Sequence, residues 1–139
     1  MDKVISIQQP FAQTVCLGIK KIETRSWVTK HRGLLLIHAT MRADFTAMEW
    51  FYQKPLSRYR EAISKDMQLG AIIGSVMLMG IKPAIELIPN LTPVEKALGY
   101  YANDSFGWIL EEPKLFDKPI FMRGQQGLWS FDMEEVQHG

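Results

Sequence analysis

The sequence predicts a single α+β domain over residues 1–139, with about six mostly antiparallel strands and flanking helices. Three observations favour this class: the length of 139 residues suits one domain, helical patterns cluster in the first half, and most connections between strands are short. Short connections suit antiparallel pairing and a closed or nearly closed β-barrel. The composition, 47% apolar and 22% charged residues, is typical of a globular protein.

The first elements are predicted from β-branched residues, proline and glycine. Val4–Ile7 is a β-branched run typical of a strand. Pro10 suits the first turn of a helix, and Gly18 suits the position just past its end. The segment 20–27 alternates like a strand, whereas 34–39 is apolar enough for a central strand covered on both faces.

The middle of the chain is predicted to be helical and the rest to be mainly strands. Asp44 suits the N-cap of a helix over 45–54, which Pro55 interrupts. Further helices are expected over 57–67 and 93–98, and further strands over 71–81, 105–113, 114–124 and 127–133. Gly74 and Gly80 indicate bulges or a close backbone approach. Trp50 and Trp108 fall at helical or alternating spacing and are interpreted as core.

Charge and cysteine content exclude several classes of function. The net charge of +1 excludes nucleic-acid binding through a uniformly basic surface, but a local basic patch remains compatible with it. Cys16 is the only cysteine, which excludes an intramolecular disulfide and a cysteine-rich zinc site, and its neighbours indicate a buried side chain. His38 stands alone in an apolar strand, which indicates a hydrogen-bonded core residue. No metal site or cofactor is predicted.

No apolar run approaches the about 20 residues that a membrane span needs. We therefore expect a cytoplasmic protein with no membrane partner.

A basic segment over 18–33 is the main candidate for a functional site. It holds five of the chain's sixteen Lys and Arg residues and one acid, Glu23. Lys20 and Glu23 are candidates for a functional pair, or for a surface ion pair worth about 0–1 kcal/mol. Residues three apart on a regular strand point to opposite faces, so the two converge only if the chain bends or enters from the Gly18 turn.

The rest of this segment carries residue types that suit nucleic acid. Arg25 suits bidentate contact with phosphate and Trp27 suits stacking on a base, although both side chains could instead pack on the core. The turn residues Lys30, His31 and Arg32 could reach phosphates or form only a solvated loop.

Polar residues at two other places complete the candidate site. Gln8 and Gln9 end the first strand before a helix N-terminus, where a glutamine amide could read a base edge or simply form the turn. Arg123, Gln125 and Trp129 flank the turn before the last strand. Because the last strand can lie beside the first in a barrel, these residues could lie near Gln9 and Lys20, or Trp129 could fill the core and leave the turn exposed.

The segment Ser6–Ala39 resembles the opening of ASCH domains, which belong to the PUA-like superfamily. The shared pattern is a strand, Gln-Pro, an apolar helix, GIKKIETRSW, a basic turn, Arg-Gly and LLIHA, and the closing GQQGLWSF also has a counterpart. The resemblance implies a PUA-like β-barrel with flanking helices and a cleft lined by the Gly-x-Lys-x-x-Glu-x-Arg segment. It also implies a role with RNA, DNA or modified nucleosides.

The resemblance leaves an enzyme open. Some ASCH domains are nucleic-acid-binding modules of transcription coactivators, one bacterial subgroup hydrolyses N4-acylated cytidines, and another member behaves as a ribonuclease. Lys20 matches a Lys of the hydrolases, but Glu23 holds the position of their Thr. Thr24 is one residue further on, where a strand would point it to the opposite face.

Three functions therefore remain. In the first, the chain binds RNA or another single-stranded nucleic acid through Gln9, Lys20, Lys21, Arg25, Trp27, Lys30, His31, Arg32, Arg123, Gln125 and Trp129. In the second, it hydrolyses a modified nucleoside or RNA: Lys20 stabilises developing charge or accepts a proton, and Glu23 acts as general base on water. The third is a protein-interaction module that uses the helices over 44–67.

Overall fold

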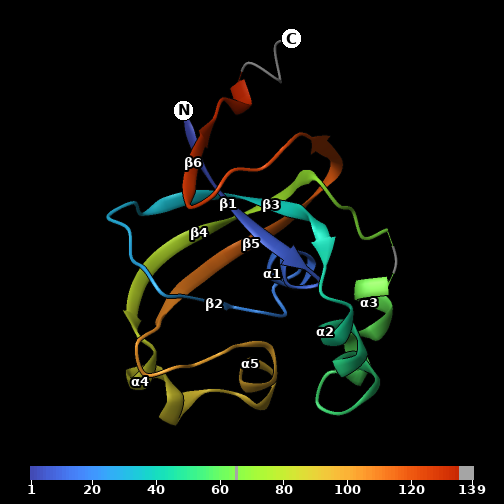
Figure 1. Cartoon of the computed structure of the whole chain (residues 1–139), viewed down its shortest axis with the longest axis vertical. Helices are drawn as coiled ribbons and strands as arrows, with labels where there is room; N and C mark the ends of the chain where they lie inside the picture. The colour runs from blue at the N-terminus through green and yellow to red at the C-terminus, as the bar shows by residue number, and fades with distance from the viewer. Residues whose placement is uncertain (65, 135–139) are drawn as a thin grey trace.

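A mixed sheet of six strands forms the framework of the computed structural model, which describes residues 1–64 and 66–134 (Figure 1). The strands are β1 (Asp2–Gln9), β2 (Ile22–Arg25), β3 (Gly33–Ala43), β4 (Ala71–Pro83), β5 (Phe106–Phe121) and β6 (Leu128–Phe131). Their order is β2-β5-β4-β3-β1-β6. β1 pairs in parallel with β3, and every other neighbouring pair is antiparallel. The predicted α+β class with mostly antiparallel strands is confirmed.

The edges of this sheet are β2 and β6, and the strand pairings among the described residues do not join them. Closure into a β-barrel therefore stays a prediction. The segments 105–113 and 114–124, predicted as separate strands, are one strand, β5. That prediction was wrong because Glu112, at φ 50°, redirects the chain without ending its pairing with β4.

The helices are short and flank the sheet. α1 (Phe11–Cys16) ends before Gly18 at φ 75°, and the Asp44 carboxylate caps α2 (Phe45–Glu49) by accepting from the Ala47 N–H at 2.9 Å. The others are the 3₁₀ turns η1 (Trp50–Tyr52), η2 (Ser57–Tyr59) and η3 (Ile88–Asn90), and the helices α3 (Arg60–Ser64), α4 (Ala84–Leu87) and α5 (Pro93–Leu98). Across the described residues, no helix has the length and apolar character needed to span a membrane.

The main core lies between α1 and the sheet, where α1 packs against β1, β3, β4 and β5. The approach is close at Gly74: a Cβ there would overlap the Lys114 carbonyl oxygen and lie 2.6 Å from Cys16 Sγ. The predicted role of this glycine is confirmed. Cys16 is buried, as predicted, and burial raises the pKa of its thiol to about 12.

Two tryptophans interpreted as core behave differently. Trp108 on β5 is fully buried, as predicted, and its ring meets Trp27 edge-on at 4.9 Å between centroids. Trp50 is instead 43% exposed. Its interpretation as core was wrong because Ala47 and Phe51 occupy the buried side of this short segment, which turns Trp50 outward.

Candidate nucleic-acid interface

Two hollows meet along one side of β1 and form a continuous cleft. The first, the Trp27 hollow, encloses about 670 Å³ and is lined by Gln8, Phe11, residues 23–27 and Arg42. The second, the Arg123 hollow, encloses about 760 Å³ and is lined by His38, Gly70 and residues 122–127. Both hollows also include Ser6, Arg25, Thr40 and Met41. We call the two together the cleft.

Strand pairing explains why these distant segments come together. β1 lies between β3 and β6, so the end of β3 and the turn that precedes β6 both flank it. The expectation that the last strand lies beside the first is confirmed, since Val4 pairs with Trp129. β2 reaches the same place through its pairing with β5, in which Arg25 faces Phe106.

Arg25 is held rigidly at the point where the two hollows meet. Its Nε and Nη2 donate to Glu23 Oε2 at 3.2 and 3.0 Å, and Nη2 also donates to the Ser6 carbonyl oxygen at 2.8 Å. Within the described residues, every bond of Arg25 runs through these two nitrogens, which leaves Nη1 for a ligand. Because Glu23 is buried, its charge holds Arg25 with little screening from water.

Lys20 lies behind this pair. Its Nζ is 4.0 Å from Glu23 Oε1 and donates to the Leu98 carbonyl oxygen at 3.1 Å. The side chain is only 2% exposed, and burial lowers the pKa of Lys20, although Glu23 and Glu95 oppose that shift. The two residues converge because the chain enters β2 from the Gly18 turn. Lys20 lines neither hollow of the cleft, so a ligand there meets Glu23 and Arg25 before it.

The turn over 122–127 is attached to the strands beneath it by a chain of hydrogen bonds. His38 Nε2 lies 2.8 Å from the Met122 carbonyl oxygen, and because a carbonyl oxygen can only accept, the ring nitrogen donates in this bond. His38 Nδ1 then accepts from the Ser6 hydroxyl at 3.2 Å, and the Trp129 indole N–H donates to the same hydroxyl at 3.2 Å. These bonds hold Arg123 and the glutamines beside Arg25.

Gly124 makes this attachment possible. A Cβ at this position would lie 2.6 Å from His38 Cε1 and 2.7 Å from Ser6 Oγ, so a side chain would push the turn away. His38 is 1% exposed and is the hydrogen-bonded core residue that the sequence predicts.

The cleft therefore brings together Arg25, Trp27, Arg123 and Gln125 of the predicted set, with Glu23. Gln9 is fully buried: its side chain accepts from the Gln13 N–H at 2.8 Å and donates to the Gln68 carbonyl oxygen at 2.9 Å. Trp129 is buried beneath the cleft, with its ring 5.6 Å from His38. Neither lines a hollow.

The predicted basic turn also lies outside both hollows. Arg32 Nη1 donates to the carbonyl oxygens of Thr29 and His31 at 2.8 Å each, and His31 Nε2 lies 2.7 Å from the Leu34 carbonyl oxygen. Lys30 is exposed on the same turn. The polar groups of the turn are thus satisfied largely by the turn itself.

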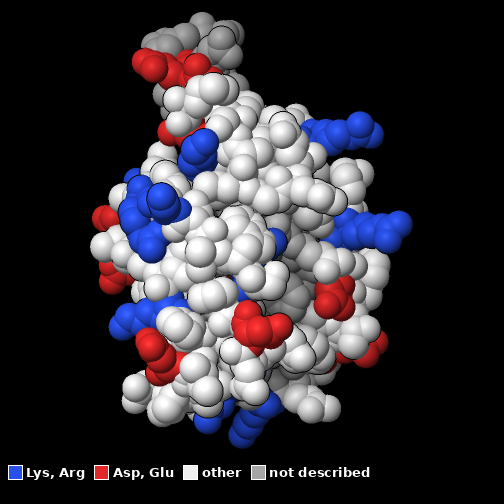
Figure 2. All heavy atoms as spheres, turned by 60° about the vertical axis from the view of Figure 1, so that its left-hand side comes forward, with Lys and Arg blue, Asp and Glu red and all other residues white. Residues whose placement is uncertain are grey.

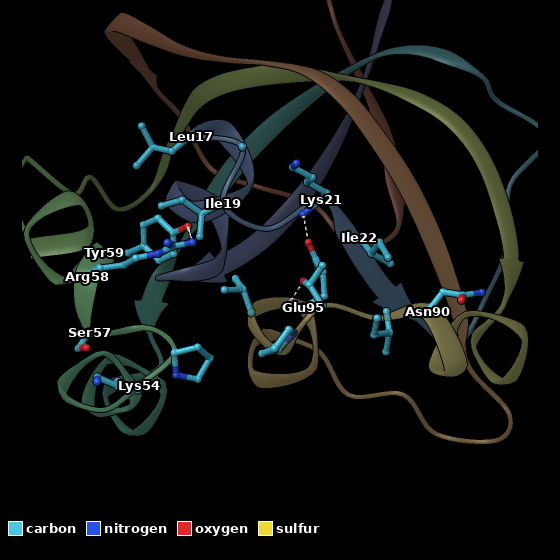
Figure 3. Close-up of a pocket in the computed structure, with 16 residues that line it drawn as sticks. Leu17, Ile19, Lys21, Ile22, Lys54, Ser57, Arg58, Tyr59, Asn90 and Glu95 are labelled. Atoms are coloured by element: carbon cyan, nitrogen blue, oxygen red, sulfur yellow. Dashed lines mark hydrogen bonds between the residues drawn. The ribbon is translucent and has the colours of Figure 1, made fainter.

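Lys21 faces a third, apolar hollow, which we call the groove (Figure 3). It encloses about 920 Å³ between the end of α1, the start of β2, η2 and α5. Lys21, Lys54 and Arg58 line it together with aliphatic side chains and Tyr59. Figure 3 shows the Glu95 carboxylate turned toward the Lys21 backbone N–H, from which it accepts at 2.7 Å. Burial raises the pKa of Glu95.

Sequence reasoning missed several lining residues. Ser6, Thr40, Met41 and Arg42 all line the cleft, but none of them was a sequence-based candidate, whereas Gln8, which also lines it, was. Thr40, Met41 and Arg42 directly follow the buried strand over 34–39, and a basic residue just past such a strand was the one available signal.

Charged side chains are scattered on the face that Figure 2 shows. Lys and Arg occur there together with Asp and Glu, separated by uncharged surface, and no large area has one sign. No group of three or more His, Cys, Asp or Glu side chains suited to a metal ion occurs within residues 1–64 and 66–134. The positive charge of the cleft therefore comes from three residues that line it, Arg25, Arg42 and Arg123.

Comparison with known proteins decides the family. The sequence profile of the ASCH domain matches residues 5–120. This chain belongs to the ASCH domain family. The ASCH domain is 28% identical over 130 residues to Activating signal cointegrator 1 of Mus musculus and 27% identical to that of Homo sapiens, covering 92% of this chain in each case. It spans only 22% of the length of each of these relatives.

Solved structures show the same fold. The crystal structure of ASCH from Zymomonas mobilis matches with a TM-score of 0.59 and 16% identity, covering 98% of this chain and 91% of that one. A crystal structure of a point mutant of the same Zymomonas mobilis protein also matches with a TM-score of 0.59 and 16% identity, over 99% of this chain and 94% of that one. At 16% identity the likeness supports the fold of the ASCH domain. It does not identify a ligand, which has to be inferred from the geometry of the cleft.

Proposed function

We propose that this ASCH domain binds RNA or another nucleic acid in the cleft. The observation that carries the proposal is the set of side chains that share it: three arginines, three glutamines and Trp27, with a single acid, Glu23, already paired to Arg25. Arginine suits phosphate oxygens, glutamine amides read base edges, and an indole stacks on a base. Family membership supports the same proposal.

The arginines have different roles in this proposal. Arg25 is fixed by three hydrogen bonds, so it loses little side-chain entropy when it binds a phosphate. Arg42 and Arg123 are exposed, each in a different hollow, and hold the backbone of the ligand in the two halves of the cleft. Trp27 stacks a base in its own hollow, where Trp108 supports its ring.

Charge reversal at the rim tests the proposal. Fluorescence anisotropy with labelled RNA and DNA oligomers at low salt should show binding that weakens as salt rises. Arg42→Glu and Arg123→Glu should each weaken binding by roughly tenfold and reduce the slope of affinity against salt by about one. Arg58→Glu, the same charge change in the groove, is the matched control and should leave binding unchanged.

Two outcomes would remove the proposal. One is the absence of binding to any oligomer at low salt. The other is an equal loss of affinity for Arg58→Glu and the two cleft variants, which would indicate only a general effect of net charge.

The hydrolase alternative has weaker support. Lys20, which would stabilise developing charge, lies behind Glu23 with its Nζ bonded to the Leu98 carbonyl oxygen, and Glu23 is itself bonded to Arg25. A general base must lie within hydrogen-bond distance of the proton that it removes. Glu23 already accepts hydrogen bonds from Arg25, and these bonds compete with such a contact. Release of product from N-acylated nucleosides or RNA, lost in Lys20→Ala, would favour an enzyme over a binding module.

A further inference from the structure

An exposed aromatic strip leads away from the cleft along α2 and η1. Phe45 is 73% exposed and Trp50 is 43% exposed, which is unusual for side chains of this size on consecutive turns. The buried side of the same segment is formed by Ala47 and Phe51, so the two exposed rings are not needed to complete the core.

The strip begins at the cleft. Met41 and Arg42 line the Trp27 hollow, and Phe45 follows three residues later at the start of α2. Phe11 lines the same hollow, and its ring centroid lies 6.0 Å from that of Trp50. Phe11 therefore connects the Trp27 hollow with Trp50, and the backbone from Arg42 leads from the same hollow to Phe45.

The chemistry of the strip favours bases over phosphates. Flat aromatic rings suit unpaired bases, whose faces are free, whereas the bases of a duplex already stack on one another. Glu49 stands between these two residues in the sequence and is exposed, and its carboxylate would repel a phosphate placed against α2. A strand on this surface would therefore turn its bases to the rings and its phosphates to solvent.

We propose that Phe45 and Trp50 form a base-stacking surface that continues the cleft, so that the ligand is an unpaired strand running from the Trp27 hollow onto α2. This inference rests on the proposed nucleic-acid function. It adds the strandedness of the ligand and a minimum length: a short oligomer occupies the cleft alone, whereas a longer one also reaches the strip.

A length series of oligoadenylates, measured by fluorescence anisotropy, tests this inference. Phe45→Ala and Trp50→Ala should each weaken binding of a ten-nucleotide strand about tenfold and leave a three-nucleotide strand, measured by competition, unchanged. Tyr100→Ala is the matched control, because Tyr100 is 79% exposed but lies outside both the cleft and the strip. Affinity for a blunt ten-base-pair duplex should not respond to either variant.

Two further variants sharpen the test. Trp50→Phe should retain most of the affinity, because a phenyl ring also stacks on a base. Glu49→Gln should strengthen binding of the long strand slightly, because it removes a repulsive charge. Phe45→Ala carries the test if Trp50→Ala fails to fold, since Phe45 contributes little to the core.

The failures are distinguishable. One outcome is that Arg42→Glu weakens binding of the long strand but neither aromatic variant does; another is that the aromatic variants weaken binding of short and long strands equally. Either result would overturn the stacking surface and leave the proposal for the cleft intact. If no oligomer binds the parent protein, both proposals fall. Loss of self-association or of a protein partner in these variants, with oligomer binding unchanged, would assign the strip to protein contact instead.

Discussion

The groove is lined by the segment that enters β2 and the cleft by the residues from Glu23 to Trp27, and each contains basic side chains. In the cleft, the basic groups are arginines accompanied by glutamines, and Arg25 is fixed by a buried carboxylate and a backbone carbonyl oxygen. In the groove, Lys21, Lys54 and Arg58 surround an aliphatic surface. Basic residues of one sequence thus lie in different surroundings, because only the cleft, and not the groove, combines an arginine fixed by hydrogen bonds with glutamine amides.

Displacing the turn over the cleft should have the largest effect. Gly124→Val places a side chain against His38 and Ser6, so the turn must move and the His38–Met122 bond must break. We expect the free energy of unfolding to fall by about 1–3 kcal/mol from overpacking. We expect oligomer affinity to fall at least about tenfold as Arg123 leaves the cleft.

Urea denaturation and fluorescence anisotropy measure the two effects of Gly124→Val. Gly80→Ala is the control, because a Cβ at Gly80 would have no heavy atom within 4 Å. Unchanged binding in Gly124→Val would mean that the turn takes no part in the interface.

Neutralising Glu23 should have the next largest effect. Glu23→Gln keeps the shape of the side chain but removes the charge that holds Arg25 and lies near Lys20. Loss of these charged interactions should lower the free energy of unfolding by about 1–3 kcal/mol, measured by urea denaturation. Oligomer affinity should also fall, because Arg25 loses its fixed position. Thr24→Ser, a neighbouring conservative change, is the control, and full stability in Glu23→Gln would contradict the role given to Glu23.

Reversing charge on the predicted basic turn should matter less. Lys30→Glu combined with Arg32→Glu should weaken binding by less than about threefold at physiological salt, because screening acts within about 8 Å and the turn lies outside the cleft. Fluorescence anisotropy of this double variant, measured alongside Arg42→Glu and Arg123→Glu, compares the losses of oligomer affinity. A loss as large as theirs would support the sequence-based prediction that this turn contacts phosphate.

The smallest effect should come from the groove. Burial raises the pKa of Glu95, so the folded protein retains this proton at pH values where the unfolded chain has lost it. Stability from this group is therefore fully present below about pH 4.3 and is lost as the pH rises through the folded pKa. Glu95→Gln replaces the carboxyl with a group that does not titrate. The free energy of unfolding of the variant should therefore be slightly higher than that of the parent at pH 7 and equal to it at pH 4.

Urea denaturation at pH 4 and pH 7 measures the effect of Glu95→Gln. Glu111→Gln changes an exposed acid in the same way and should show no such dependence on pH. A variant less stable than the parent at pH 7 would show that the Glu95 charge is needed by Lys20.

Local patterns were sufficient for much of the fold. Pro10 and Gly18 mark the limits of α1, Asp44 caps α2, and the apolar run over 34–39 is a central strand, because each of these signals acts within a few residues. The pairing of Lys20 with Glu23 was also foreseeable, since it needs only the bend at Gly18. The long strand β5 was divided in the prediction because a residue at positive φ inside a strand has no sequence signature.

The site could be predicted only in part, because the direction of each side chain depends on distant pairings. Arg25 reaches the cleft because β2 pairs with β5, more than eighty residues along the chain. Arg42 joins the site because β3 pairs with β1 and ends beside Gln8. Trp50 looked like core because helical spacing does not reveal that α2 stops at Glu49.

The strand β5 connects the two halves of the cleft. It pairs with Arg25 near its first residue, bends at Glu112, and ends two residues before Arg123, so the two arginines of one hollow are joined by a single curved strand (Figure 1). The distance between the two halves of the cleft therefore depends on the number of residues in this strand. Under the proposed function, relatives that lengthen or shorten β5 should differ in the spacing of the phosphates that they accept, even with every arginine retained.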